Sequence, residues 1–375
     1  MRNVILFLYI SFISQMSFSQ SVNSAFYFSD SIVSNDSNEV RFTLESDGFF
    51  KNNEYFNDFV EGYSIPGVAT RPAIEWQYGA KTLITAGVLF QKFAGDPSKP
   101  IFAPIFRLQQ KLSPSIELSI GELGNMLANN LAEPFYSFDD YYYSPVNYGL
   151  RFNTHTKIYN SRLWLNWQQF IRKGDAFREY FSVGHTGAFT VYSTENISIN
   201  IPLQFVFRHK GGQINQTDTS MQTLHNNAAG IEMIYHSNIY NRKAYIGLKY
   251  LNVLFIDMSP SKALEYDKGY ALYPSLIAGL DNFNLYCEYW DAINFLPTNE
   301  YTLYSAQSLI DPLLFGDHRK MLNTKLDFVK NYSQDIRFIA RIETFNDIST
   351  GSFDYTYGFH LVMNPSILLK KTTKR

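Results

Sequence analysis

The strict alternation of apolar and polar residues over positions 197–208 is the feature that most constrains the fold. Apolar side chains occupy every second position on one side, and polar ones lie between them: Ile197, Ile199, Ile201, Leu203, Phe205 and Phe207 against Ser198, Asn200, Gln204 and Arg208. A period of two indicates a β-strand with one apolar and one polar face. Similar segments recur along the chain, about sixteen of them, each near the roughly ten residues that a tilted strand needs to cross a membrane.

The connections between these segments alternate between short and long. Tyr78–Ala80 and Leu112–Pro114 are tight turns, whereas 209–227 and 291–319 are long. An up-and-down transmembrane barrel has this pattern, with short periplasmic turns and long extracellular loops. A β-sandwich or a β-propeller would not be expected to alternate short and long connections in this way. We therefore predict an all-β, antiparallel up-and-down transmembrane β-barrel of about sixteen strands (14–18).

The two ends of the chain add information about location. Residues 1–19 carry a charge at Arg2, an apolar run and small residues at Ser17 and Ser19, which predicts a signal peptide. Residues 20–375 then form one barrel domain, and we expect it in the bacterial outer membrane. Beyond the last predicted strand the chain continues through Asn364 and Pro365 to a basic tail. The tail is either a disordered periplasmic extension or evidence that the last strand lies elsewhere.

Composition limits the functions that the chain can have. A net charge of −2 gives no footprint for nucleic acid, and the single cysteine, Cys287, excludes a cysteine-based zinc site. Phosphate-binding, dinucleotide-binding and zinc-protease motifs are missing, so we expect no cofactor and no metal. Because charge on the lipid face is costly, the charged face of each strand must line the lumen, and we predict a wet passage. His155, His185, His209, His225 and His360 are expected in the lumen or the loops.

An acidic insert at 121–147 separates two alternating segments. It holds four carboxylates, three consecutive tyrosines and no Lys or Arg. As the third long loop, it resembles the third loop of sixteen-stranded bacterial porins, which folds inward and narrows the channel. The stretch around it also resembles exported barrel proteins of Bacteroidota. The porin resemblance implies a constriction with an acidic side (Glu122, Glu133, Asp139 and Asp140) and a basic side (Arg107, Arg151, Arg337 and Arg341). Alternatively, the loop lids the barrel from outside.

We therefore predict a porin-like channel for passive diffusion of small solutes, not an enzyme. Outer-membrane lipid and small solutes are the expected partners, and self-association is left open. An alternative is a plugged barrel that serves as an adhesin or as the scaffold of an uptake or secretion assembly. A third hypothesis is a lipid hydrolase, since 234–238 resembles the His and Ser of outer-membrane phospholipases and lipid A deacylases. That family pattern needs His-x-Ser, whereas His236 and Ser237 are adjacent and point to opposite faces of a strand.

Overall fold

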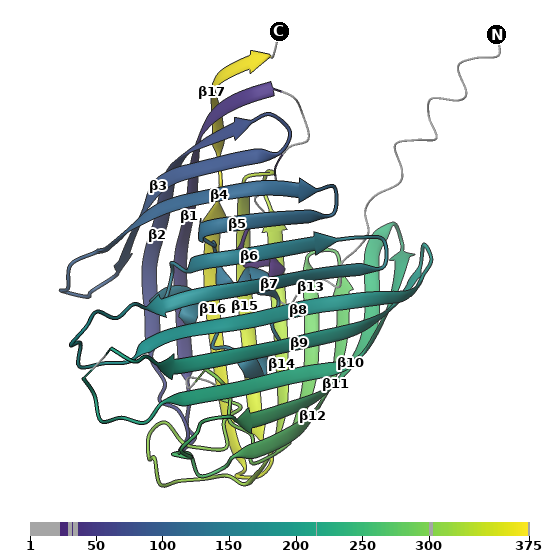
Figure 1. Ribbon diagram of the computed structural model, residues 1–375. Coiled ribbons are helices and arrows are strands. Elements are labelled where there is room, and N and C mark those ends of the chain that lie inside the picture. Colours follow the sequence, from purple (N-terminus) through teal and green to yellow (C-terminus); the bar gives the residue numbers. More distant parts are fainter. Residues whose placement is uncertain (1–22, 29–31, 33–36, 215, 300–302, 374–375) are drawn as a thin grey trace.

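The strands of the computed structural model close into a barrel. The structure describes residues 23–28, 32, 37–214, 216–299 and 303–373, so the predicted signal peptide lies outside the described residues. Every neighbouring pair of strands is antiparallel, and the long loops gather toward the lower left of Figure 1. Within the described part of the chain, no helix has the length and apolar character to cross a bilayer.

The strand boundaries follow the alternating segments of the sequence. The strands are β1 (Ser37–Glu54), β2 (Ser64–Tyr78), β3 (Thr82–Phe93), β4 (Ile101–Ser113), β5 (Ile116–Glu122), β6 (Tyr148–His155), β7 (Tyr159–Gln169), β8 (Glu179–Ser193), β9 (Ile197–Gly211), β10 (Gln222–Ile239), β11 (Arg242–Asp257), β12 (Lys268–Leu280), β13 (Phe283–Ile293), β14 (His318–Asn331), β15 (Ile336–Asp347), β16 (Ser352–Met363) and β17 (Ser366–Thr373). Four short helical turns belong to the segments that enter the lumen and are not part of the wall: η1 (Ser24–Phe26), η2 (Met126–Asn129), η3 (Glu133–Phe135) and α1 (Asp140–Tyr143).

The barrel closes where the last strands meet the first. β16 pairs with the second half of β1, and β17 pairs with its first half. Ser46 pairs with Met363 and Thr43 with Ser366, so β17 continues β16 in the same register beyond Pro365. β16 and β17 together act as one wall strand that pairs along β1, so the barrel is sixteen-stranded, as the sequence predicts. The basic tail is therefore part of the wall up to Thr373.

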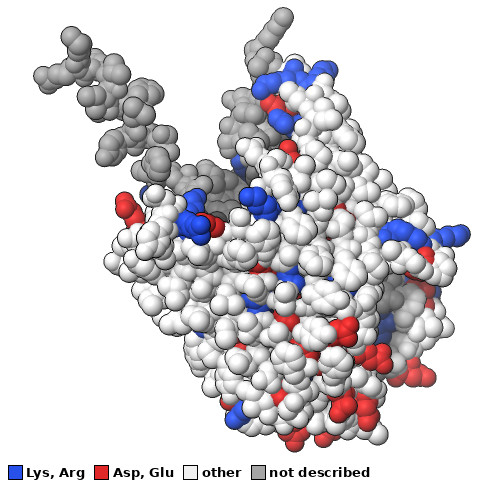
Figure 2. All heavy atoms as spheres, turned by 180° about the vertical axis from the view of Figure 1, so that it is seen from behind, with Lys and Arg blue, Asp and Glu red and all other residues white. Residues whose placement is uncertain are grey.

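The two faces of the wall have opposite chemistry. On β10, Ile231 and Met233 are exposed toward lipid, whereas Glu232 between them is buried in the lumen. Exposing a charge to lipid is unfavourable, by about 2–4 kcal/mol for Lys or Arg at the bilayer midplane and by less for Asp or Glu, which explains why the charged side of the strand faces the lumen. Figure 2 shows wide uncharged areas of wall, with acidic side chains gathered toward its lower end.

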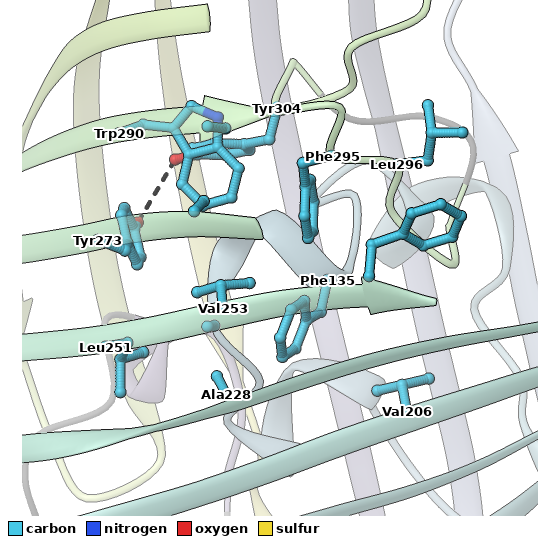
Figure 3. Close-up of a cluster of buried hydrophobic side chains, with 14 of the residues drawn as sticks. Phe135, Val206, Ala228, Leu251, Val253, Tyr273, Trp290, Phe295, Leu296 and Tyr304 are labelled. Atoms are coloured by element: carbon cyan, nitrogen blue, oxygen red, sulfur yellow. Dashed lines mark hydrogen bonds between the residues drawn. The ribbon is translucent and has the colours of Figure 1, made fainter. Parts of the chain in front are cut away.

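Most of the lumen is filled by the chain itself, which differs from the predicted wet passage. The inward loop (123–147), the β13–β14 loop (294–317) and the segment 23–28 all contribute buried side chains. In the cluster of Figure 3, Phe135 from the inward loop and Phe295 from the β13–β14 loop pack near Trp290 of the wall. The charges that predicted a wet lumen are paired by these segments, so the interior resembles a packed core.

Candidate functional site

The inward loop begins at a buried arginine–glutamate cluster. Glu122 at the end of β5 accepts a bond from Arg107 of β4 at 2.6 Å and lies 3.1 Å from Arg71 of β2. The Glu122 side chain is fully buried. An unpaired buried charge is strongly destabilising, so the two guanidinium groups hold the loop's first carboxylate in place. The Arg107–Glu122 pair joins the predicted acidic and basic sides.

The remaining acids of the loop bind other residues of the lumen. Glu133 pairs with Lys325 of β14, and Asp139 pairs with Lys51 of β1 at 2.5 Å. Asp140 accepts a hydrogen bond from Asn299 of the β13–β14 loop. The pKa of Asp140 is raised to about 6, mainly by burial; the Asn299 hydrogen bond opposes this shift, and the nearby Asp139 adds to it. The loop therefore folds into the lumen and does not lid the barrel.

The predicted basic residues also have other partners. Arg151 donates to the backbone oxygen of Leu123 at 2.6 Å, and Arg337 donates to that of Ala25 at 2.7 Å. Arg341 forms a two-pronged pair with Asp327 of the neighbouring strand, with both distances 2.7 Å. The Arg151 bond anchors the loop and the Arg337 bond anchors the segment 23–28, whereas the Arg341 pair joins two wall strands. The eight residues thus take part in several separate contacts along the lumen.

One interior group has the residue types of a catalytic relay. His360 Nδ1 lies 2.8 Å from Asp47, and its Nε2 lies 3.0 Å from the hydroxyl of Tyr142 on the inward loop. Tyr141 also donates to Asp47. His360 and Tyr142 are only 2% and 0% exposed, so neither lipid nor solute has access to them. The group anchors the inward loop to β1 and β16.

Three histidines lie on the lipid-facing side of β8, β9 and β10, contrary to the expectation of lumen or loop positions. The neighbours of His209 and His225, namely Arg208, Leu224 and Asn226, are buried in the lumen. Next to His185, Thr186 bonds to the backbone of the inward loop at Asn129. Because side chains alternate across a strand, the three imidazoles point outward. They lie in the halves of their strands toward the long loops, which is the extracellular side.

His209 is the member of this group that lies beside an aliphatic hydroxyl. Its Nδ1 is 2.9 Å from Thr223 Oγ1, and the two residues are directly paired across β9 and β10. On the other side Phe181 of β8 pairs with His209, and their rings are 5.1 Å apart. The site therefore has an imidazole and a hydroxyl on an apolar wall at the height of the outer leaflet.

Gly211 and Glu179 complete the surroundings of His209. A β-carbon at Gly211 would collide with His209 Nε2, so the ring leans over this glycine toward the outer rim. Glu179 is the first residue of β8 and pairs with Gly211. Because side chains alternate along a strand, Glu179 lies on the same face as Phe181 and His209. Glu179, His209 and Thr223, on three adjacent strands, are referred to below as the outer-rim triad.

The hydroxyl–imidazole pair suggested by the sequence is not a site. His236 and Ser237 are consecutive residues near the inner end of β10, and the His236 ring lies against Tyr245. Among the described residues, no group of His, Cys, Asp and Glu could hold a metal ion. The outer-rim triad was missed because 209–227 was predicted to be one loop, whereas β9 extends to Gly211 and β10 begins at Gln222.

Comparison with solved structures supports the outer membrane as the location. An outer membrane protein of Vibrio cholerae, OmpT lacking loop L8, matches at 10% identity with a TM-score of 0.50, covering 88% of this chain and 100% of that one. OpdK, an outer membrane protein of Pseudomonas aeruginosa, matches at 9% identity with a TM-score of 0.50, covering 88% and 99%. At these identities the likeness shows the fold. This chain is an outer-membrane β-barrel.

The family comparison corrects one prediction. No curated protein matches the sequence. A family model described as "Lipid A 3'-O-deacylase-type" matches residues 32–372, nearly the whole chain. That family is one of enzymes, so the prediction that the chain is not an enzyme is wrong. The prediction rested on the missing His-x-Ser pattern within one strand, which does not consider pairs formed between strands.

Proposed function

The chain belongs to the lipid A 3'-O-deacylase-type family, and we propose that it hydrolyses an ester-linked acyl chain of a lipid A-type glycolipid at the outer-rim triad. The observation that carries the proposal is the 2.9 Å contact between His209 Nδ1 and Thr223 Oγ1 on the lipid-facing wall. A base within hydrogen-bond reach of a hydroxyl is the arrangement that activates a nucleophile.

Location favours the outer-rim triad over the interior group. A membrane lipid cannot enter a lumen that is filled by the inward loop, whereas it lies against β8–β10 without any rearrangement. Phe181 and Phe207, next to His209 on the same face, offer apolar surface to acyl chains. The hydroxyl and the imidazole are at the end of the wall where the ester groups of an outer-leaflet lipid are expected.

The residues act in the following order. His209 takes the proton of Thr223 while Oγ1 attacks the carbonyl carbon of the ester. The protonated imidazole then gives its proton to the departing sugar oxygen, and the carbon–oxygen bond breaks. Water, deprotonated by His209, releases the fatty acid from Thr223 and regenerates the hydroxyl. Glu179, at the start of the neighbouring strand, adds a carboxylate to the same rim.

Fatty acid release by the purified full-length protein tests the proposal. The substrate is lipid A dispersed in an alkyl dimethylamine oxide detergent, and the product is measured by mass spectrometry. His209→Ala should abolish release. The matched control is His225→Ala, because this histidine is on the same face and stacks on Phe207 at 4.0 Å. Equal release by wild type and His209→Ala, or no release by folded wild type, would contradict the proposal.

A second candidate function is slow passage of small solutes through the lumen. It is favoured by a cavity of about 230 Å³ between the inward loop and the wall formed by β7, β8 and β9. Passage requires the inward loop to move, since Glu122, Glu133 and Asp139 tie it to three different strands. Single-channel recording in a planar bilayer distinguishes the two. Rare channel openings in the wild type that become frequent in Glu133→Gln support solute passage. The absence of channel current in both the wild type and Glu133→Gln contradicts it.

A further inference from the structure

β17 has one paired edge and one open edge. Its ladder is with β1, whereas β15 pairs with β16 only as far as Ile336 and Met363. The Asn364 N–H donates to the backbone oxygen of Asp335 at 2.8 Å, at the short β14–β15 connection where the neighbouring hairpin ends. β17 therefore runs past its neighbour on that side, and in Figure 1 it rises with the start of β1 above the other strands. Short connections mark the periplasmic end, so the open edge faces the periplasm.

The ladder with β1 leaves alternate backbone groups of β17 directed to the open edge. The Leu44 N–H donates to the backbone oxygen of Pro365 at 3.1 Å, and bonded pairs alternate with non-bonded pairs along an antiparallel ladder. Ser366 and Leu368 are non-bonded positions in this register, so their N–H and C=O groups point away from β1. Unpaired backbone groups on an edge strand are a template for a further strand.

The side chains of β17 leave both of its faces open. Ile367 and Leu368 point to opposite faces of the strand, and they are 59% and 46% exposed. Leu369, on the same side as Ile367, is exposed as well. A strand laid along the open edge can therefore cover apolar side chains on either face.

Two lysines give the open edge its charge. Lys371 lies 2.8 Å from Glu39, which also accepts a hydrogen bond from Arg41 at 2.8 Å. Lys370 is exposed, and within the described part of the chain it forms no ion pair. Lysine on an edge strand opposes pairing with a basic strand, whereas opposite charges across a ladder stabilise it. The matching partner therefore carries a carboxylate opposite Lys370.

A second copy of this chain does not match the edge. Two barrels in one membrane have the same orientation, so their β17 strands run in the same direction and cannot pair antiparallel across a twofold axis. An in-register parallel pair places the two lysine-bearing ends side by side, which like-charge repulsion opposes. The partner is therefore another protein.

We propose that the open edge of β17 binds an extended acidic segment of a periplasmic protein as an added strand. The backbone of the segment pairs with Ser366 and Leu368, its apolar side chains lie beside Ile367 and Leu369, and a carboxylate lies next to Lys370. Strand addition to an exposed sheet edge is a recurring mode of peptide recognition. The edge is at the periplasmic end and the outer-rim triad is at the extracellular end, so this binding does not depend on the deacylation proposed above.

Fluorescence anisotropy with a labelled synthetic heptapeptide and the full-length protein in detergent tests the inference. The peptide alternates valine and threonine and has a glutamate at each end, so that it fits the edge in either direction. A Kd of about 0.1 mM is expected. The same peptide with lysine in place of glutamate should bind about tenfold more weakly. An acidic peptide with a central proline should not bind, because proline removes a donor that the added strand needs.

Variants of β17 separate backbone pairing from charge attraction. Leu368→Pro removes an outward N–H and keeps the ladder with β1, so it should weaken binding about tenfold. The matched control Leu368→Ala keeps the N–H and should weaken binding by less than about threefold. Lys370→Glu should weaken binding of the acidic peptide about fivefold and strengthen binding of the lysine peptide. Circular dichroism checks the strand content of each variant, and Lys370→Glu carries the test if Leu368→Pro does not fold.

Saturable binding of the acidic peptide that folded Leu368→Pro and Lys370→Glu both weaken supports the inference. No binding at up to about 5 mM peptide overturns it. Equal binding by wild type and folded Leu368→Pro also overturns it, because the contact then depends on charge alone, as it does for an anionic cell-wall polymer. Two copies per particle in sedimentation that become one in Leu368→Pro assign the edge to a second copy and overturn it as well.

Discussion

An imidazole–hydroxyl contact inside the barrel and one on its outer face differ in their access to lipid. Inside, His360 lies between Asp47 and Tyr142 and is almost completely buried. Outside, His209 touches Thr223 and is partly exposed on the lipid-facing wall. By residue type alone the interior group, with its carboxylate, is the better catalytic candidate. By access to a lipid, only the exterior one is usable.

The difference shows how burial decides the role of similar groups. In the lumen, hydrogen-bonding groups without water must satisfy one another, so Asp47, His360 and Tyr142 serve as an anchor for the inward loop. At the outer rim, the His209–Thr223 pair does not hold a loop in place or satisfy a buried polar group of the lumen. Its presence there is better explained by chemistry on a lipid.

The largest expected effect is at Thr223. Thr223→Val keeps the shape and removes the hydroxyl, so the rate of fatty acid release should fall about 10²–10⁴-fold. Thr223→Ser restores a nucleophile and should retain most of the rate. The free energy of unfolding should stay within about 0.5 kcal/mol, since the side chain faces lipid. A fully active Thr223→Val would instead assign the attack to water.

The next effect concerns the interior. Lys325 pairs with Glu133 and lies 3.2 Å from Glu343, so Lys325→Met leaves two buried carboxylates without their cation. The free energy of unfolding in urea should fall by about 3–5 kcal/mol. Adding Glu133→Gln should recover part of this loss. If the single variant is as stable as wild type, the inward loop is not anchored by this pair.

Asp140 gives the inward loop a pH dependence. Its pKa is raised by burial to about 6, against about 3.9 in an unfolded chain. The folded state therefore binds more protons than the unfolded state between these pH values. The contribution of Asp140 to the free energy of unfolding is thus most favourable below pH 4, falls as the pH rises to 6, and is least favourable above pH 6. Asp140→Asn mimics the neutral form, so its advantage over wild type in urea should grow by about 2 kcal/mol between pH 4 and pH 8. A constant difference contradicts this.

A smaller stability effect is expected at His360. His360→Phe keeps the packing against Phe26 but leaves Asp47 and Tyr142 without the shared partner. The free energy of unfolding should fall by about 1–3 kcal/mol, while fatty acid release by the folded protein persists. His225→Phe, on the lipid face, is the control and should change little. Loss of fatty acid release in folded His360→Phe would indicate that the catalytic group lies in the lumen and not at the outer rim.

The smallest effect is a displacement of the exterior imidazole. Gly211→Ala places a methyl group where His209 Nε2 lies, so the ring must rotate away from Thr223. The rate of release should fall about tenfold, with stability unchanged. Gly187→Ala is the matched control, because there the added methyl group meets His185 instead. Equal rates for both variants would mean that the position of His209 does not matter.

The sequence predicts the wall well because alternation and connection length are local signals. Whether 121–147 folds inward or lids the barrel does not follow from the sequence, which leaves both arrangements open. The partners of the acids in this segment do not follow either, because Lys51 and Lys325 reach Asp139 and Glu133 only after the barrel closes. The outer-rim triad was hidden for another reason. His209 and Thr223 are polar residues on the lipid-facing side, and they interrupt the apolar pattern that marks a strand.

The most direct test of the central claim is the mass of lipid A from cells that produce the protein. Lipid A from cells with wild type should lack one ester-linked acyl chain, and so should lipid A from cells with folded His360→Phe. With Thr223→Val, the acyl chain should remain. An unchanged lipid A in the presence of folded wild-type protein, or loss of the chain with Thr223→Val and not with His360→Phe, would contradict the assignment of catalysis to the outer rim.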